Sequence, residues 1–276
     1  MRWSVDAEQA IKKVPFFVRK KVRKKVEAYA AQKGKGSVDL NDVTELKQKF
    51  LSKGGMESQI KGYEVSTCFG PSGCPNVAHS TARLAEEIEG ILKKEDILSF
   101  LKANVRGDLK FHHEFRVVLA DCPNACSRPQ IVDIGIIGAA APELTGTGCT
   151  LCGACVGACK EDAVVLDPEN EIPEIDESKC LLCAKCSQDC PTGTITEKEK
   201  GYRVMLGGRL GRRPRLAMEV PGLQTHDQVI RIVKNSLQFY KSHSKNGQRF
   251  SHLLSSVDQV MWPMPERDTP CCTSPQ

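Results

Sequence analysis

Residues 115–138 of this chain read FRVVLADCPNACSRPQIVDIGIIG. Two runs rich in Val, Ile and Phe, at 115–120 and 131–138, have the composition of β-strands. Cys122 and Cys126 lie between them, and the prolines of this connection indicate a turn. The stretch therefore predicts two strands joined by a connection that carries two thiols where the chain turns.

Cysteine is unusually common, with 14 copies among 276 residues. The first residues contain no apolar core of a secretory signal, so we expect a cytoplasmic protein. Because the cytosol keeps thiols reduced, metal ligation is favoured over a disulfide framework. The longest apolar runs, such as residues 136–142, are too short to span a membrane.

Eight of the cysteines form a tandem motif. Residues 149–160 read CTLCGACVGACK and residues 180–191 read CLLCAKCSQDCP, and each contains C-x2-C-x2-C-x3-C. In this pattern three thiolates hold one cubane and the fourth reaches the other cluster. A pair of zinc knuckles is the alternative interpretation. The predicted [4Fe–4S] ligand sets are Cys149, Cys152, Cys155 and Cys190 for one cluster, and Cys180, Cys183, Cys186 and Cys159 for the other.

Four more cysteines stand in two pairs outside the tandem. Cys68 and Cys74, in STCFGPSGCPN, form C-x5-C, and Cys122 and Cys126 form C-x3-C. Glycines and prolines around each pair mark turns, where thiolates from distant segments can converge. Spacing alone leaves two interpretations open, which are a third [4Fe–4S] cluster and two buried structural pairs.

The order of these motifs resembles one known family. A C-x5-C followed by a C-x3-C and the run DIGI, at 133–136, is similar to the signature of siroheme-containing sulfite and nitrite reductases. The segment GYRVMLGGRLGRRPRLAMEVPG, residues 201–222, and the eight-cysteine insert before it resemble the anaerobic and dissimilatory sulfite reductases. The resemblance covers residues 60–255.

This resemblance implies a cofactor set of three [4Fe–4S] clusters and siroheme. The implied ligands of the third cluster are Cys68, Cys74, Cys122 and Cys126. The sulfur of Cys126 is further expected to bridge to the siroheme iron. Siroheme carries carboxylates, so its pocket should be basic, although a solvated surface is the alternative role for each arginine. The candidates for siroheme binding are Arg128, Arg209, Arg212, Arg213 and Arg215.

The resemblance also implies sulfite or nitrite as a small anionic substrate, and an electron-donor protein or subunit as a partner. Electrons are expected to pass from the two insert clusters to the siroheme-coupled cluster. The alternative is a non-catalytic electron-transfer subunit, because the segment before Cys68 does not resemble the family's usual N-terminal half. The sequence leaves the oligomeric state open and assigns no catalytic residue. Neither binding to nucleic acid nor a membrane span is expected.

The N-terminal residues are basic and resemble a different family. Residues 1–53 carry 14 Lys and Arg against 6 Asp and Glu, a net charge of +8. Trp3, Ala7 and the run VPFFVRKKVRKKVEAYA are similar to the small helical C-terminal domain of the B subunit of light-independent protochlorophyllide reductase. The basic helix is either a solvated face, or a lid or docking module for an anionic tetrapyrrole pocket or an acidic partner.

Three short helices are expected in this basic domain. Pro15 suits the first turn of the second helix, and Asp39 or Asn41 suits the cap of the third. An apolar stripe is predicted on the second helix. Its members are Phe16, Val18, Val22, Val26 and Tyr29 or Ala30.

The rest of the chain predicts an α+β protein. In full, the expected architecture is a siroheme-reductase-type α/β half-domain with an inserted dicluster ferredoxin domain and a small N-terminal helical domain. We expect one or two helices within 76–104, a strand at 202–208, and a helix at 225–243 capped by Thr225 or Asp227.

The predicted domains follow the changes in charge. They are the basic domain 1–53, the first reductase part 54–142 (net −2), the insert 143–199 (net −8), the second reductase part 200–258, and a flexible tail 259–276. Residues 200–276 together have a net charge of +7. The tail holds Cys271 and Cys272, for which an exposed reduced pair is favoured over a redox-active one.

Overall fold

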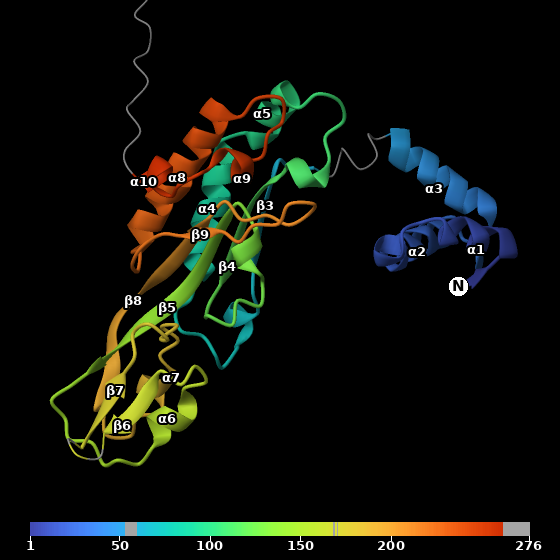
Figure 1. Cartoon of the computed structure of the whole chain (residues 1–276). Coiled ribbons are helices and arrows are strands. Elements are labelled where there is room, and N and C mark those ends of the chain that lie inside the picture. Colours follow the sequence, from blue (N-terminus) through green and yellow to red (C-terminus); the bar gives the residue numbers. More distant parts are fainter. Residues whose placement is uncertain (53–59, 168, 170, 262–276) are drawn as a thin grey trace, which may run out of the picture. The chain divides into compact units, whose positions relative to one another are not determined.

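The structure is a computed structural model that describes residues 1–52, 60–167, 169 and 171–261. The chain forms two compact units (Figure 1). Unit 1 consists of Met1–Ile60 and Asp108–Lys110, and unit 2 consists of Lys61–Gly107 and the chain from Phe111 onward. Each unit has its own core and is described by itself.

Unit 1 contains the three expected helices and a short parallel pair of strands. Its elements are β1 (Arg2–Trp3), α1 (Val5–Lys12), α2 (Phe16–Gln32), β2 (Ser37–Val38) and α3 (Leu40–Ser52). Asp39 rather than Asn41 caps α3, since Asp39 Oδ1 accepts from the Asp42 N–H at 3.0 Å and Asp42 Oδ2 accepts from the Asp39 N–H at 3.1 Å. Pro15 directly precedes α2.

The core of unit 1 is small and apolar. Ala7, Val26, Ala30 and Val38 are buried in it, with partly buried Trp3, Val22, Val43 and Leu46 packed around them. The predicted stripe on α2 is therefore present at its centre. Its first member is not buried, because Phe16 at the start of α2 is 80% exposed.

Unit 2 is built on one mixed five-stranded sheet, which confirms the α+β expectation. The strand order is β3-β4-β5-β8-β9, with β3, β4 and β5 parallel and β8 and β9 antiparallel to their neighbours. The strands are β3 (Tyr63–Thr67), β4 (Phe115–Ala120), β5 (Ile134–Leu144), β8 (Ile195–Leu206) and β9 (Met218–Glu219).

Helices pack on this sheet and bury its apolar residues. They are α4 (Ala82–Lys94), α5 (Ile97–Asn104), α8 (His226–His243), α9 (Phe250–Leu253) and α10 (Asp258–Met261). Thr225, not Asp227, caps α8 through a capping box with Gln228. Phe115 and Phe250 pack around Tyr240 of α8. The expected tail differs at its start, because α10 continues to Met261 and Val260 is fully buried.

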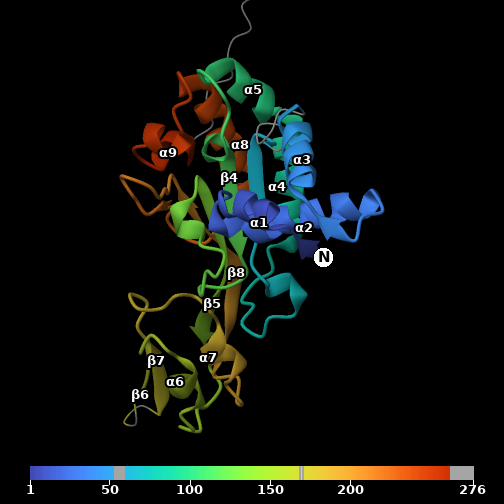
Figure 2. The ribbon, with the colours of Figure 1, turned by 90° about the vertical axis from the view of Figure 1, so that its right-hand side faces the viewer.

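Two long strands carry the insert away from the core of unit 2 (Figure 2). β5 and β8 pair from Ile134 with Leu206 to Leu144 with Ile195, and a register shift at Ala141–Pro142 marks a bulge. The insert between them contains α6 (Ala154–Ala158), β6 (Val164–Asp167), β7 (Ile172–Ile175) and α7 (Lys185–Gln188). The strand expected at 202–208 therefore starts several residues earlier, inside the insert.

Two expectations from the sequence concern the tail and membrane spans. Cys271 and Cys272 lie beyond residue 261, outside the described residues. Within the described part of the chain, no helix combines the length and the apolarity that crossing a bilayer requires.

Candidate iron–sulfur centre

Parallel pairing brings the two separate cysteine pairs to one edge of the sheet. β3 and β4 are in register up to Thr67 opposite Leu119, and Cys68 and Cys122 follow the carboxyl ends of these strands. The Cys68 N–H donates to the Leu119 carbonyl at 3.1 Å, so the ladder continues to the first thiol. The C-x5-C and C-x3-C segments thus leave the same sheet edge side by side.

A cavity of about 60 Å³ at this edge is lined by all four of these cysteines. We call the set the core cage: Cys68, Cys74, Cys122 and Cys126. The Cys122 side chain is buried, whereas Cys126 is exposed. The other two thiols are intermediate. The two thiols of the C-x3-C segment therefore differ, with one inside the protein and one at its surface.

Backbone N–H groups point at a sulfur of the core cage. Gly70 and Asp121 each donate an N–H to Cys68 Sγ at 3.3 Å. The turns that allow this approach contain left-handed residues, namely Gly73 (φ 96°) and Ala125 (φ 49°). Thiolates that accept N–H bonds are what an iron–sulfur cluster needs around it, because such bonds tune its potential. The residues present therefore fit a cluster.

Asp121 ties the core cage to α4, a role that we did not predict. Its Oδ1 accepts from the Thr81 N–H at 3.0 Å and from the Thr81 hydroxyl at 2.6 Å. Its carbonyl accepts from the N–H groups of Ala78 and His79. Oδ2 is buried without a hydrogen-bond partner among the described residues and faces Gly70. Asp121 thus connects the C-x3-C segment, the end of the C-x5-C segment and the start of α4.

Two glycines of β5 allow loops to lie directly on the strand. A Cβ at Gly135 would meet the Pro129 backbone, with the carbonyl carbon at 2.6 Å. A Cβ at Gly138 would meet the His79 backbone, with its carbonyl carbon at 2.9 Å and its oxygen closer still. Since a side chain needs about 3.4–4 Å, only glycine permits these contacts.

Several cysteines of the insert lie close to one another in the structure. Cys155 lies near Cys149 and Cys190. Cys186 lies near Cys180, Cys183 and Cys159. We call the two predicted ligand sets the outer cage (Cys149, Cys152, Cys155 and Cys190) and the inner cage (Cys159, Cys180, Cys183 and Cys186). Within the described residues, no three Cys, His, Asp or Glu side chains meet as ligands of a single metal ion.

The two motifs of the insert repeat the same backbone conformation. Leu151 and Leu182, in equivalent positions, have φ values of 54° and 60°. Gly153 and Ala184, which precede α6 and α7, have φ values of 75° and 58°. Such left-handed residues allow tight turns of the backbone between the cysteines of each motif. N–H groups again face sulfur, with Leu151 donating to Cys149 Sγ and Ala163 to Cys159 Sγ at 3.3 Å.

Burial changes the acidity of the thiols. It raises the pKa of Cys186 to about 11. It also raises the pKa of Cys122, Cys155 and Cys180. Burial acts in the same direction on Cys190, but hydrogen bonds with the Ile195 N–H and the Thr192 hydroxyl outweigh it and lower the pKa to about 7. Because clusters bind thiolates, ligation at the buried positions must displace a proton.

The inner cage lies against the core cage. The Ala140 N–H donates to the Leu182 carbonyl at 2.8 Å, and Lys185 Nζ donates to the Pro75 carbonyl at 2.9 Å. A cavity of about 340 Å³ is lined both by the four inner-cage cysteines and by Asn76, Cys122 and Asn124. The sequence offered no signal for Lys185, because its partner lies 110 residues away.

The predicted arginines divide into two groups. Arg209 donates to the carbonyls of Arg213 and Ser251, and Arg215 donates to those of Gly207, Ser251 and Leu254. These guanidinium groups therefore hold the 207–215 segment against α9. The arginines with exposed side chains are Arg128, Arg212 and Arg213.

The chain just after the 207–215 segment packs beside the C-x3-C segment. Ala217 contacts a small apolar cluster that contains Ala125, and its N–H donates to the Gln130 carbonyl at 2.8 Å. Guanidinium groups donate strong hydrogen bonds to carboxylates. Arg249, which we did not predict, joins this basic region and contributes to lowering the pKa of His252, after burial and Arg209.

Comparison with known proteins identifies both parts of the chain. The family described as "Nitrite and sulphite reductase 4Fe-4S domain" matches residues 61–259. The family described as "Proto-chlorophyllide reductase 57 kD subunit" matches residues 3–47. Both resemblances drawn from the sequence are therefore confirmed.

Individual relatives agree with these matches. The coenzyme F420-dependent sulfite reductase of Methanocaldococcus jannaschii is 28% identical over 217 residues, which cover 78% of this chain and 32% of the relative. The C subunit of the anaerobic sulfite reductase of Salmonella typhimurium is 29% identical over 150 residues, covering 53% of this chain and 44% of the relative. The B subunit of the light-independent protochlorophyllide reductase of Heliobacterium modesticaldum is 43% identical over 54 residues, covering 20% of this chain and 10% of the relative.

The chain thus spans less than half the length of each of these relatives. The reductase match nevertheless takes in nearly all of unit 2, including the core cage and the insert. The chain belongs to the nitrite and sulphite reductase 4Fe-4S domain family.

Proposed function

We propose that this chain is a siroheme and iron–sulfur oxidoreductase. Its substrate would be sulfite or nitrite, because the family to which the chain belongs is named for reductases of both anions. The observation that carries the proposal is the core cage, in which four thiols from two strand ends line one cavity and one of them, Cys126, is exposed. Siroheme, when bound, supplies the iron at which the substrate is reduced. The reaction is proposed to take place in the cytoplasm, where these thiols stay reduced.

The residues of unit 2 would then divide the work. Cys68, Cys74, Cys122 and Cys126 would hold the third [4Fe–4S] cluster, and the exposed Cys126 would couple that cluster to siroheme. The exposed guanidinium groups of Arg128, Arg212 and Arg213 pair with siroheme carboxylates. Arg209 has a supporting role here, because its donors hold the loop that carries the other two.

We infer an order for electron transfer, from the outer cage to the inner cage to the core cage. The order is supported by the cavity that the inner-cage cysteines share with Cys122 and Asn124. It is also supported by the Lys185–Pro75 hydrogen bond, which links the inner-cage segment to the residue after Cys74. The outer cage is proposed as the entry point.

A second candidate function is electron transfer to another chain without catalysis. The Salmonella relative is named as a subunit, and the chain covers only 44% of it. In that case the three cages would still conduct electrons, and the substrate would bind in a partner. The two candidates differ in whether the isolated chain binds siroheme.

Anaerobic purification followed by visible spectroscopy tests the proposal. The protein is reconstituted with iron, sulfide and siroheme, and then supplied with reduced methyl viologen and either sulfite or nitrite. A siroheme absorption band and substrate-dependent dye oxidation support the enzyme. A protein that holds its clusters but neither binds siroheme nor oxidises the dye supports the electron-transfer subunit.

A further inference from the structure

The basic side chains of α2 divide into a group that is engaged within unit 1 and an outward group. The two arginines of α2 form the first group. Arg19 donates to the carbonyls of Lys12 and Val14, at the end of α1, at 2.9 and 2.9 Å. Arg23 pairs with Glu8 at 3.3 Å and lies 4.5 Å from the centre of the Trp3 ring. Both guanidinium groups are thus engaged within unit 1.

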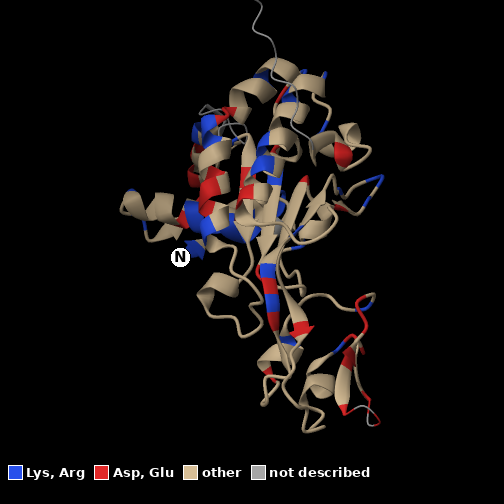
Figure 3. Cartoon of the chain, turned by 90° about the vertical axis from the view of Figure 1, so that its left-hand side faces the viewer, with Lys and Arg blue, Asp and Glu red and all other residues tan. Residues whose placement is uncertain are grey.

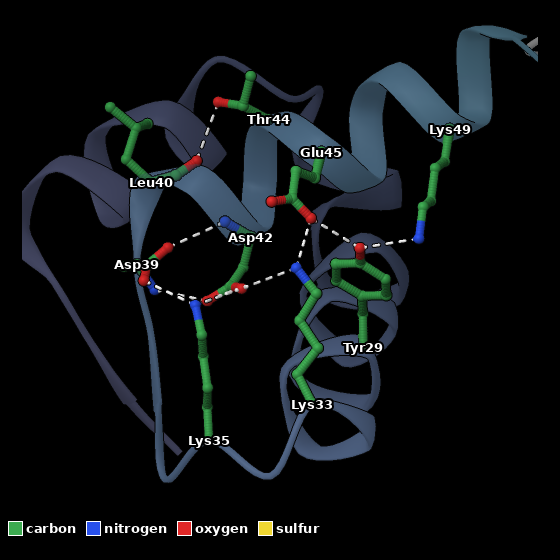
Figure 4. Close-up of polar contacts among 9 residues, drawn as sticks. All are labelled: Tyr29, Lys33, Lys35, Asp39, Leu40, Asp42, Thr44, Glu45 and Lys49. Carbon is green, nitrogen blue, oxygen red and sulfur yellow. Dashed lines mark hydrogen bonds and ion pairs between the residues drawn. The ribbon is translucent and has the colours of Figure 1, made fainter.

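The cations between α2 and α3 are also paired (Figure 4). Lys35 Nζ contacts Asp39 at 2.9 Å and Asp42 at 2.8 Å, and Lys33 pairs with Glu45. With Glu8 and Glu27 held by Arg23, five of the six carboxylates in residues 1–53 are engaged inside the unit. The positive excess of this segment is therefore not neutralised locally.

Four lysines of α2 form the outward group, which we call the lysine face: Lys20, Lys21, Lys24 and Lys25. All four are exposed, and no hydrogen bond or ion pair to them occurs in the described residues. One turn before Lys20 lies the exposed ring of Phe16. One turn after Lys24 lies the small residue Ala28. Figure 3 shows Lys and Arg in blue, including segments close to the N-terminus.

The lysine face is unfavourable for α2 taken alone. Lys20 with Lys24, and Lys21 with Lys25, are like-charge pairs at i,i+4 and repel each other. The first turn of α2 contains no acidic residue, and Pro15 gives it no side-chain cap. A local arrangement that opposes helix stability is expected where the surface serves a function.

We propose that the lysine face is the docking surface for an acidic electron-carrier protein. This inference rests on the proposed function, which requires a donor. Lysines act as point charges that speed and orient transient encounters. A nucleic-acid partner is disfavoured, because both arginines of α2 already have partners within unit 1 and only lysines remain on the outward face. Insertion into a membrane is disfavoured, because Val22 and Val26 on the apolar side of α2 pack in the core of unit 1.

Docking on unit 1 would serve the clusters of unit 2 through the covalent connection. A carrier held on one unit is confined near the other, so its effective concentration there rises. In the transfer itself, the reduced carrier loses an electron and a cluster of this chain gains it. The exposed Phe16 ring provides an apolar contact at the end of the lysine face, as aromatic residues do in protein interfaces.

The test replaces the lysine face by glutamate, in the variant K20E/K21E/K24E/K25E of the full chain. The matched control, K93E/K94E/K102E/K245E, changes the same number of exposed lysines in unit 2. The probe is a purified acidic [2Fe–2S] ferredoxin, with binding measured at roughly 0.05 M and 0.5 M salt. We expect the first variant to weaken binding roughly tenfold or more at low salt. The control should change it little, and high salt should remove the difference.

Three results would overturn the docking proposal. They are unchanged ferredoxin binding in the lysine-face variant, equal loss in the control, and selective loss of binding to duplex DNA or to anionic lipid vesicles instead. Circular dichroism verifies that the variants remain helical. The binding measurement needs no turnover, so it stays informative if dye-driven sulfite reduction fails. If turnover is present, reduced methyl viologen should drive both variants equally, because a small dye needs no docking surface.

Discussion

Replacing Gly138 by alanine tests whether close backbone contact on β5 builds the core cage. The new Cβ would lie 2.9 Å from the His79 carbonyl carbon and 3.1 Å from the Asp121 carbonyl oxygen. Ordinary contacts of this kind are 3.4–4 Å. The segment before α4 therefore has to move away from the strand until these distances reach the ordinary contact range.

The cost follows from what that movement breaks. The N–H groups of Ala78 and His79 donate to the Asp121 carbonyl at 2.9 and 3.2 Å. Losing two such bonds costs about 1 kcal/mol each, and overpacking adds about 1–3 kcal/mol. Gly138→Ala should thus destabilise unit 2 by roughly 3–5 kcal/mol. It should also disturb the segment that ends the C-x5-C motif.

Gly90→Ala is the matched control, since Gly90 lies on α4 with nothing within 4 Å of an added Cβ. It should stabilise the helix by about 0.5–1 kcal/mol. Urea unfolding followed by circular dichroism measures both variants, and iron analysis measures the clusters. If Gly138→Ala is as stable as the wild type and keeps all its iron, the packing argument is refuted.

Three further predictions concern single side chains around the cages. Asp121→Asn keeps an oxygen for the Thr81 bonds but removes a carboxylate beside the core cage. The reduction potential of the third cluster should therefore rise in an EPR-monitored redox titration, with little loss of stability. Lys185→Met removes the 2.9 Å bond to Pro75, so reduction of the third cluster by pre-reduced insert clusters should slow in stopped-flow measurements while iron content stays unchanged. Burial lowers the pKa of His79 below the ordinary value of about 6.5, so the unfolded chain binds its proton more readily and stability should fall as pH drops below that value. His79→Gln should flatten this acid loss in urea melts at pH 7 and pH 5, and an unchanged slope would contradict it.

Local patterns explain why much of the fold was predictable. The strand at 115–120 and the helices on either side of the sheet follow from apolar periodicity. The tandem motif predicts ligand sets because its spacing reflects the size of a cubane. Even the choice of Thr225 as a cap is a local matter, decided by Gln228 three residues later.

What could not be predicted depends on contacts between distant segments. Asp121 receives its hydrogen bonds from residue 81, and Lys185 reaches residue 75. The early start of β8 depends on its partner β5, not on its own composition. The charge of Arg209 makes it a candidate for binding siroheme carboxylates. Its guanidinium group donates instead to the carbonyls of Arg213 and Ser251, and the contact with Ser251 is visible only in the tertiary structure.

Phe16 illustrates the same limit in unit 1. Helical periodicity predicts it as part of the apolar stripe, yet it is 80% exposed because the core of unit 1 begins further along α2, at Val22. Its exposure next to Lys20 is what gives the lysine face an apolar contact. The difference between pattern and structure is here part of the functional proposal.

The central claim is that two distant cysteine pairs hold a third cluster in addition to the two of the insert. The most direct test is the iron and acid-labile sulfide content of the anaerobically reconstituted chain without siroheme, compared with Cys122→Ser. Three cubanes predict about 12 iron atoms and 12 sulfides per wild-type chain, falling to about 8 of each in the variant. A wild-type content of about 8, unchanged by Cys122→Ser, would contradict the claim.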